Sequence, residues 1–466
     1  MESKKFDVLI IGGGPGGYVC AIRAAQEGLS VGIVERENLG GICLNWGCIP
    51  TKSLLHTADL FREIQEAETF GISISEATFD LDKVVQHSRE VSEQLTNGVK
   101  FLMRKNKIEV FDGIGRLDGP GRVIVESENQ PEIIIESNAI VIATGARARS
   151  LPSIEPDGEF IWTYREAMIP KELPKELLVI GSGAIGMEFA SFYHALGSNV
   201  TIVEVLPQVL PVEDAEISKF VQKEFEERGI KIMTATRVES LEKTKKGLVA
   251  KITSANSSEE AIFDRAILAV GVTGNIENLG LETTSVKTEK GSIQVNEWLE
   301  TEEEGVYAIG DVAGPPLLAH KAMHEGVFCA EQIAGIEHAQ PMQKSRIPGC
   351  TYCHPQVASV GLTESAAKTA GHDLKIGRFP LMGNGKAIAI GDTAGFVKTI
   401  FDADTNELIG AHLVGPGVTE LIQGFVIAMG LETTEAELME TVFPHPTVSE
   451  AMHESVLDAY GHALHI

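Results

Sequence analysis

The sequence predicts an α/β fold of about three domains, and three observations carry this prediction. The chain has 466 residues, which is more than a single hydrophobic core usually serves. A pattern of strand, glycine turn, helix and strand occurs twice, far apart in the chain. The last third continues with strand and helix patterns but lacks that glycine turn. We therefore expect two related α/β domains and a third domain of another kind.

The repeated pattern lies at Val8–Glu35 and Leu177–Glu204. The first segment reads VLIIGGGPGGYVCAIRAAQEGLSVGIVE, and the second reads LLVIGSGAIGMEFASFYHALGSNVTIVE. Each begins with a run of apolar and β-branched residues, continues through a glycine turn into an apolar-periodic helix, and ends with a second strand closed by glutamate. The sequence thus predicts two βαβ units.

Glycines in both units follow the G-x-G-x-x-G spacing of a dinucleotide-binding turn. The first glycine permits the tight turn, the second lets the backbone approach a pyrophosphate, and the third lets the helix pack closely on the strand. The phosphates then meet a helix N-terminus, which favours anions, and the terminal glutamate can accept a hydrogen bond from a ribose hydroxyl. Two Rossmann-like domains, each binding one dinucleotide, follow from this pattern. The residues concerned are Gly12, Gly14, Gly17 and Glu35 in the first unit, and Gly181, Gly183, Gly186 and Glu204 in the second.

Between the two units the sequence predicts helices at about 54–70 and 81–104, followed by a β-meander at 108–136. A buried strand and a Thr-Gly turn are expected at 139–152, and a strand ending in Gly-Asp at 305–312. The expected domain limits are residues 1–150 with 275–345, residues 151–274, and residues 346–466.

Composition excludes several classes of function. With 43% hydrophobic and 23% charged residues and no long apolar span, the chain is expected to be a soluble, cytoplasmic protein that does not enter a membrane. Its formal net charge of -27 would repel a nucleic-acid backbone and suits a basic protein partner instead. Six cysteines are too few and too unevenly spaced for a structural disulfide framework.

Two of these cysteines, Cys43 and Cys48, stand close together in the segment GGICLNWGCIPTK, residues 40–52. On an ideal helix their Cα atoms would lie roughly 8 to 9 Å apart, whereas a disulfide needs about 4.4 to 6.8 Å. A bond between them therefore requires irregular backbone, for which Gly47 supplies freedom. A structural disulfide, a metal-binding pair and buried thiols are the alternatives, and redox chemistry beside a cofactor is favoured.

Taken together, the two dinucleotide units and the motifs GGICLNWGCIPTK, ATG, GDV and HPTVSE resemble the flavin-dependent pyridine nucleotide disulfide oxidoreductases, in one order over essentially the whole chain. The resemblance implies FAD in the first Rossmann-like domain, NAD in the second, and an α+β C-terminal domain that forms the interface of a homodimer. The closing stretch TVFPHPTVSEAMHESVLDAYGHALHI is most similar to family members that oxidise dihydrolipoyl groups.

The resemblance also implies roles for single residues. Cys48 is expected beside the flavin and Cys43 as the thiol that exchanges with substrate. Lys52 is expected near the flavin and paired with Glu188. The further cofactor-binding positions are Thr144, Gly145, Gly271, Asp311 and Ala319, in addition to the glycines and glutamates of the two turns.

A loop histidine, His445, precedes the sequence PTVSE. A carboxylate such as Glu450 can orient such a histidine and raise its basicity, so that it takes a proton from a thiol. The resemblance implies that this pair acts on the disulfide of the other subunit. Alternatively, Thr447 and Glu450 form a capping box at the start of a helix.

The activity implied by the resemblance is oxidation of protein-bound dihydrolipoyl groups with reduction of NAD, as part of 2-oxo acid dehydrogenase complexes. The implied partners are lipoyl domains and the peripheral-subunit-binding segment of an acyltransferase. Glu204 favours NAD because its charge would repel a 2′-phosphate, and VEVLPQVLP offers no nearby arginine. The alternatives are a glutathione reductase-like or mercuric reductase-like enzyme, and a chain that serves chiefly as a docking subunit.

No metal site is expected. CTYCH at 350–354 matches a haem-attachment motif, but its apparent strand context argues against haem. His320 and His324 stand one helical turn apart, and a flavin-facing helix explains them without a metal. Three residues depart from the usual family pattern, and Trp46, which stands between the two cysteines, is the one closest to the chemistry; the others are Phe443 and Gln356.

Overall fold

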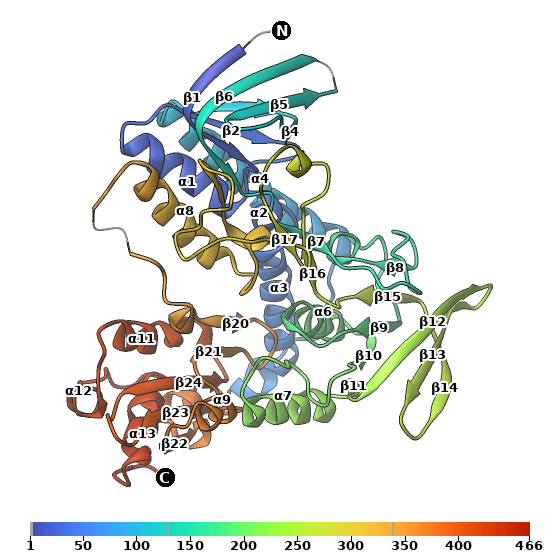
Figure 1. Ribbon diagram of the computed structural model, residues 1–466. Helices are drawn as coiled ribbons and strands as arrows, with labels where there is room; N and C mark the ends of the chain where they lie inside the picture. The colour runs from blue at the N-terminus through green and yellow to red at the C-terminus, as the bar shows by residue number, and fades with distance from the viewer. Residues whose placement is uncertain (1–2, 129, 338–339) are drawn as a thin grey trace. The chain divides into compact units, whose positions relative to one another are not determined.

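The computed structural model describes residues 3–128, 130–337 and 340–466 (Figure 1). The chain divides into two compact units, and each of them is assembled from separate stretches of sequence. Unit 1 comprises Met1–Ser53, Asp82–Arg149 and Gly271–Met342. Unit 2 comprises Leu54–Leu81, Ser150–Val270 and Gln343–Ile466.

Unit 1 contains the first predicted dinucleotide turn. Its parallel strands lie in the order β3-β2-β1-β6-β19, and the antiparallel strands β5 and β4 extend from β6. Its elements are β1 (Ser3–Ile11), α1 (Pro15–Gln26), β2 (Val31–Glu35), α2 (Gly41–Trp46), the start of α3 (Cys48–Glu66), α4 (Leu81–Lys105), β3 (Glu109–Asp112), β4 (Ile114–Leu117), β5 (Arg122–Ser127), β6 (Gln130–Ile142), β7 (Ala146–Ala148), β16 (Val272–Gly274), β17 (Thr288–Glu289), β18 (Ser292–Ile293), β19 (Val306–Ala308), the 3₁₀ helix η3 (Gly310–Ala313) and α8 (Ala319–Ile333).

The sheet of unit 1 is apolar on both faces, as parallel strands between two covering layers should be. Val8 and Ile10 of β1 pack into one buried cluster with Cys20 of α1 and Phe328 of α8. The alternate residues of β1 pack into a second cluster on the other face, which contains Val123 of β5. Side chains of a strand point alternately to the two faces, so this one strand anchors both halves of the core.

Helices α1 and α8 lie side by side against the sheet (Figure 1). A Cβ atom at Gly326 would lie 2.5 Å from the carbonyl oxygen of Gly16, so the crossing requires glycine. The close approach brings the fully buried thiols of Cys20 and Cys329 into hydrogen-bonding contact. That contact and burial raise the pKa of the Cys329 thiol, so this thiol stays protonated at neutral pH.

Unit 2 contains the second predicted turn, in a parallel sheet of order β11-β10-β9-β15-β8, and an antiparallel sheet of order β20-β21-β24-β23-β22. Three further strands, β12, β13 and β14, form an antiparallel sheet of their own. The elements are η1 (Ala67–Phe70), β8 (Ile161–Trp162), α5 (Tyr164–Met168), β9 (Glu176–Ile180), α6 (Ala184–Ala195), β10 (Asn199–Val203), α7 (Ala215–Glu227), β11 (Lys231–Met233), β12 (Thr236–Thr244), β13 (Gly247–Ser254), β14 (Ser258–Phe263), β15 (Arg265–Leu268), β20 (Gly349–Thr351), β21 (Val357–Gly361), α9 (Glu364–Thr369), β22 (Leu374–Pro380), α10 (Gly385–Ala389), β23 (Phe396–Asp402), β24 (Leu408–Val414), α11 (Val418–Gly430), α12 (Glu435–Glu440) and α13 (Glu450–Ala459).

The predicted α/β class and both βαβ units are confirmed, and the main differences lie in the segments between them. The predicted helix at 54–70 begins earlier, because α3 starts at Cys48. The strand β6 runs unbroken from Gln130 to Ile142, although Ser137 and Asn138 are common turn residues, because β6 pairs with β1 on both sides of them. The prediction that the meander starts at 108 is wrong for its first strand, because β3 pairs in parallel with β2.

In the three described stretches of chain, no helix is both long enough and apolar enough to cross a bilayer.

Candidate active site

The first glycine turn links β1 to α1. A Cβ atom at Gly12 would lie 2.3 Å from the carbonyl oxygen of Ala143, and one at Gly17 would lie 1.9 Å from that of Gly12. These two positions therefore exclude any larger residue. No described atom lies within 4 Å of a Cβ atom built on Gly14, so the space beside this residue is open. The turn has the form that a pyrophosphate needs, with open backbone at the start of a helix.

Glu35, at the end of β2, holds this turn. One carboxylate oxygen accepts a hydrogen bond from the backbone N–H of Gly13 at 2.6 Å, and the other accepts from that of Glu37 at 2.8 Å. Burial raises the pKa of Glu35, although these N–H groups oppose the shift. The carboxylate expected to bind ribose therefore also organises the loop that would hold the phosphates.

The second glycine turn repeats this geometry in unit 2. A Cβ atom at Gly181 would lie 2.4 Å from the carbonyl oxygen of Ala269, and one at Gly186 would lie 2.0 Å from that of Gly181. The space beside Gly183 is open. Glu204 accepts hydrogen bonds from the N–H and the hydroxyl of Ser182 at 2.8 and 2.7 Å. The two units thus share a local structure in which the terminal glutamate binds its own glycine turn.

The other cofactor positions expected in unit 1 lie in loops and turns that follow β6 and β19. The Thr144 hydroxyl donates to the carbonyl of Asn275 at 2.8 Å, which ties the loop of Thr144 and Gly145 to the segment after β16. Gly271 lies just before β16, where its carbonyl accepts from Arg149 at 3.0 Å. Asp311 lies in η3, where burial raises the pKa of its carboxyl group and the charge of Lys321 opposes that shift.

A buried ion pair that the sequence analysis missed supports η3. Lys321 and Glu325 of α8 are 1% and 5% exposed and lie 3.1 Å apart. The Lys321 ammonium also donates to the carbonyls of Gly310 and Gly314, and Glu325 accepts from the Gly310 N–H at 2.7 Å. The pair therefore brackets Asp311, while Ala319 is the first residue of the same helix. The signal in the sequence was the i, i+4 spacing of lysine and glutamate in this helix.

Cys43 and Cys48 lie on two different helices that meet at Gly47. Cys43 is in α2, and Cys48 is the first residue of α3. Gly47 breaks the helix, and a Cβ atom there would lie 3.1 Å from the carbonyl oxygen of Ile42 and 3.5 Å from the Cα of Cys43. The irregular backbone that a local disulfide requires is therefore present, and the two side chains are in hydrogen-bonding contact.

Several opposing influences act on the Cys43 thiol. Contact with Cys48 and burial raise the pKa of the Cys43 thiol, while the nearby charge of Lys52 acts in the opposite direction. The reduced pair therefore keeps a proton on Cys43. Lys52 lies one turn after Cys48 in the same helix. Its expected partner Glu188 lies in α6 of unit 2, where the carboxylate accepts from the Tyr352 N–H at 3.0 Å.

His445 and Glu450 form a hydrogen-bonded pair in unit 2. The His445 Nδ1 lies 2.9 Å from the Glu450 Oε1, and the histidine side chain is 78% exposed. With Nδ1 donating to the carboxylate, Nε2 presents a lone pair to solvent and can accept a proton. Partial burial opposes ionisation of Glu450, but hydrogen bonds from the Thr447 N–H and from His445 outweigh it and lower the pKa of Glu450.

The alternative role of Glu450 as a helix cap is half correct. Its second oxygen accepts from the Thr447 N–H at 2.9 Å, but the Thr447 hydroxyl donates to the carbonyl of Pro444. The N-cap residue of α13 is Ser449, which makes no side-chain cap. One carboxylate therefore orients the histidine and stabilises the loop before the helix.

Other residues singled out in the sequence lie elsewhere. The Cys353 thiol is buried and donates to the carbonyl of Pro355, while Phe443 stacks on His453 and Gln356 accepts from the Thr419 hydroxyl. Within the described stretches, no group of three or more His, Cys, Asp or Glu side chains is placed to hold a metal ion.

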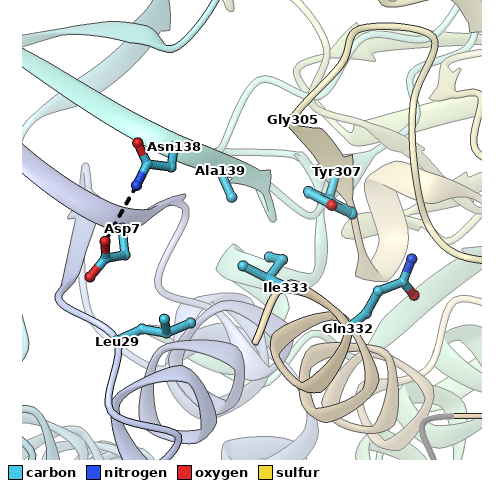
Figure 2. A pocket seen from close by; sticks show the side chains of 8 residues that line it. All are labelled: Asp7, Leu29, Asn138, Ala139, Gly305, Tyr307, Gln332 and Ile333. Atoms are coloured by element: carbon cyan, nitrogen blue, oxygen red, sulfur yellow. Dashed lines mark hydrogen bonds between the residues drawn. The ribbon is translucent and has the colours of Figure 1, made fainter. Parts of the chain in front are cut away.

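A cavity of about 280 Å³ in unit 1 is lined by eight residues (Figure 2). Among them are Gly305, which precedes β19, and Ile333, which ends α8. Asn138 donates to Asp7 on its wall, and Tyr307 and Gln332 also line it. None of the predicted site residues lines this cavity.

Comparison with known proteins defines the class of this protein. Residues 6–326 match the model of the pyridine nucleotide-disulphide oxidoreductases, and residues 347–456 match the dimerisation domain of that family. The chain belongs to this family, and its C-terminal part is a dimerisation domain.

Two relatives and two solved structures show which members of the family this chain resembles. The chain is 56% identical over 461 residues to dihydrolipoyl dehydrogenase of Zymomonas mobilis and 54% identical over 478 residues to dihydrolipoyl dehydrogenase of Rhizobium etli, with 99% of both chains covered in each case. Among solved structures it resembles LpdA of Mycobacterium tuberculosis, with a TM-score of 0.91 and 27% identity over 97% of this chain and 99% of that one. The flavoprotein disulfide reductase RclA of Escherichia coli gives a TM-score of 0.84 at 25% identity, with the same coverage.

Proposed function

We propose that this protein is a homodimeric, FAD- and NAD-dependent enzyme that oxidises protein-bound dihydrolipoyl groups to lipoyl groups. The observation that carries the proposal is the contact between Cys43 and Cys48 across the helix break at Gly47, with Lys52 one turn away. The relatives with the highest identities described above are dihydrolipoyl dehydrogenases.

The two glycine turns fit two dinucleotides, because each leaves open backbone at the start of a helix and closes through its own glutamate. We assign FAD to residues 1–150 and 275–345, NAD to residues 151–274, and the dimer interface to residues 346–466. Glu35, Thr144, Gly145, Asp311 and Ala319 would hold FAD, and Glu204 and Gly271 would hold NAD. A bound flavin would accept two electrons from a thiolate, and NAD would accept them from the flavin as a hydride.

The protein residues perform the thiol exchange. Nε2 of His445, oriented by Glu450, takes the proton of one substrate thiol. The resulting thiolate attacks the sulfur of Cys43 in the Cys43–Cys48 disulfide, forms a mixed disulfide and releases the Cys48 thiolate. The second substrate thiol attacks the substrate sulfur of that mixed disulfide and its proton passes to the departing Cys43 sulfur, while the first proton stays on His445 until solvent takes it. Oxidised lipoyl leaves, and Cys43 recovers a proton, in keeping with its raised pKa.

The partners we propose are the lipoyl domains of a 2-oxo acid dehydrogenase complex and the peripheral-subunit-binding segment of its acyltransferase. The net charge of -27 suits a basic segment, and such an attachment should weaken as salt screens the charges.

The test is anaerobic mixing of the purified protein with dihydrolipoamide and NAD, followed by the absorbance of NADH. Wild type should form NADH rapidly, Cys43→Ser should not, and Cys350→Ser should behave as wild type because Cys350 lies in β20, outside the proposed relay. If the protein binds flavin but forms no NADH, dihydrolipoyl groups are not its substrate. The alternatives are then a glutathione reductase-like or mercuric reductase-like enzyme. Faster initial rates with NADP than with NAD would contradict the role of Glu204.

A further inference from the structure

The side chain of Trp46 is anchored on both sides. Trp46 is the last residue of α2 and stands between the two cysteines. Its indole N–H donates to the carboxylate of Glu37 at 2.9 Å. The guanidinium of Arg89, on α4, lies 4.8 Å from the centre of its ring. We call Glu37, Trp46 and Arg89 the Trp46 clamp.

Arg89 also fixes the backbone at the end of α2. Its Nη1 donates to the carbonyl of Asn45 at 2.6 Å, a favourable position for a cation because carbonyls at a helix C-terminus lack helical partners. Within the described chain, Nε and Nη2 of Arg89 are buried without a hydrogen-bond partner, as expected when a guanidinium covers an aromatic face in place of water. Thr96, two turns further along α4, donates to the side chain of Asn45 at 3.0 Å.

The other end of α2 is tied to the same residues. The Asn45 amide donates to the carbonyls of Gly41 and Leu39 at 2.9 and 3.2 Å. Glu37, which binds the indole, donates its own N–H to Glu35, the carboxylate that holds the first glycine turn. A continuous set of hydrogen bonds therefore runs from that turn to the residue before Gly47.

We propose that the Trp46 clamp sets the thiol–disulfide equilibrium of Cys43 and Cys48. Gly47 alone leaves the angle between α2 and α3 adjustable, and the separation of the two sulfurs depends on that angle. By holding the end of α2, the clamp keeps the reduced sulfurs close, which raises the effective concentration of one thiol at the other and favours the disulfide. Trp46, Arg89 and Glu37 are positioning residues, because they act through the cysteines. The inference rests on the proposed redox function of that pair.

The clamp predicts a shift of the equilibrium toward the dithiol when it is broken. Trp46→Val and Arg89→Gln each remove the contact between the guanidinium and the indole ring, so each should raise the dithiol-to-disulfide ratio about tenfold, or about 30 mV for a two-electron couple. Trp46→Phe keeps an aromatic face for Arg89 and should shift the ratio less. Arg116→Gln, which removes an exposed ion pair with Glu126 in the same unit, should have no effect.

The measurement is equilibration of the full-length protein in dithiothreitol buffers of graded potential, acid quenching, and mass spectrometry of the peptide that contains Cys43 and Cys48. This readout does not depend on turnover. If wild type never forms a reversible disulfide, the proposed function itself fails. If wild type does form a reversible disulfide, and Trp46→Phe and Arg89→Gln both show the same dithiol-to-disulfide ratio as wild type at every potential, the proposed role of the Trp46 clamp is overturned. Because Trp46→Phe and Arg89→Gln keep most of the side-chain volume, the test stays decisive even where Trp46→Val does not fold.

Discussion

Single carboxylates position much of the proposed chemistry by binding backbone N–H groups as well as their functional partners. Glu35 and Glu204 each close a glycine turn, and Glu450 binds the Thr447 N–H while it holds His445. Hydrogen bonds from N–H groups favour the ionised form of a carboxylate. Each of these residues therefore has both a structural and a chemical role. A single substitution affects both roles, so two measurements are needed to tell them apart.

Replacement of Glu450 by glutamine tests which role dominates. Glu450→Gln retains one acceptor oxygen but loses the charge that stabilises protonated His445. We expect turnover to fall by about 10² to 10⁴, the usual contribution of an oriented general base, with a change of only a few degrees in melting temperature. Stopped-flow NADH formation and thermal unfolding are the two measurements. An unchanged turnover with a large loss of stability would show that capping is its main role.

A second residue-scale prediction concerns Glu213, the residue before the N-cap of α7. Burial raises its pKa from 4.5 to about 7, although one oxygen accepts from Ser359. Its Oε2 has no hydrogen-bond partner in the described part of the chain. Because the folded pKa is the higher one, the folded state binds more protons between pH 4.5 and 7, so this residue lowers the free energy of unfolding as pH rises through that window and no further above it.

Glu213→Gln should therefore raise stability at pH 8 by up to about 3 kcal/mol and leave it nearly unchanged at pH 4.5. Urea unfolding at the two pH values measures the difference. Glu239→Gln, which removes a surface ion pair with Lys251, is the matched control and should show no such pH dependence. Equal effects at both pH values would mean that Glu213 is not the titrating group.

At the scale of elements, the strand-to-helix turns are the most constrained parts of the chain. The third glycine of each turn sits against the carbonyl of the first, at 1.9 Å for a Cβ atom at Gly17 and 2.0 Å for one at Gly186. The contacted atoms belong to the backbone and cannot move aside as a flexible side chain could. A larger residue at either position would therefore displace the first turn of the helix.

Gly186→Ala should therefore abolish reduction of NAD while leaving bound flavin in place. Flavin absorbance of the purified protein and titration with NADH would measure the two sites separately. Gly98→Ala is the control, because no described atom lies within 4 Å of a Cβ atom at this position of α4; alanine there should stabilise the helix by about 0.5 to 1 kcal/mol. Loss of flavin from Gly186→Ala would contradict the assignment of the second turn to NAD.

The elements that the sequence predicted well are those fixed by local sterics. The two glycine turns follow from spacing alone, and Gly47 was expected to allow the irregular backbone that a Cys43–Cys48 disulfide requires. Contacts between distant residues were not predictable in this way. Arg89 and Trp46 lie far apart in the chain, and nothing local shows that α4 covers the end of α2. The ion pair of Lys321 and Glu325 was visible as a spacing, but only burial reveals that it supports η3.

At the scale of the whole molecule, the family resemblance implies that His445 of one subunit serves the cysteines of the other. His445 is largely exposed, and the C-terminal part is a dimerisation domain. If His445 of one subunit serves the cysteines of the other, inactive variants should complement each other. Mixing Cys43→Ser with His445→Gln under conditions of subunit exchange should restore about a quarter of wild-type activity, because about half of the dimers are mixed and one site in each is intact.

The control for that experiment is a mixture of Cys43→Ser with Cys48→Ser. Both changes fall on the same thiol pair, so no mixed dimer contains an intact site if the proposed arrangement is correct. No activity from the first mixture after exchange is verified would place His445 and the cysteines of one subunit in the same site. Activity from the second mixture would mean that Cys43 of one subunit pairs with Cys48 of the other.

The crossing of α1 and α8 has a consequence for following the protein in solution. Cys20 and Cys329 are sealed at that crossing, and Cys353 is buried in unit 2. A thiol-reactive dye added to the native protein, with the Cys43–Cys48 pair reduced, should therefore count only the other three cysteines, and each of the remaining three should react only when the unit that holds it unfolds. Dye labelling therefore reports the unfolding of unit 1 through Cys20 and Cys329, and the unfolding of unit 2 through Cys353.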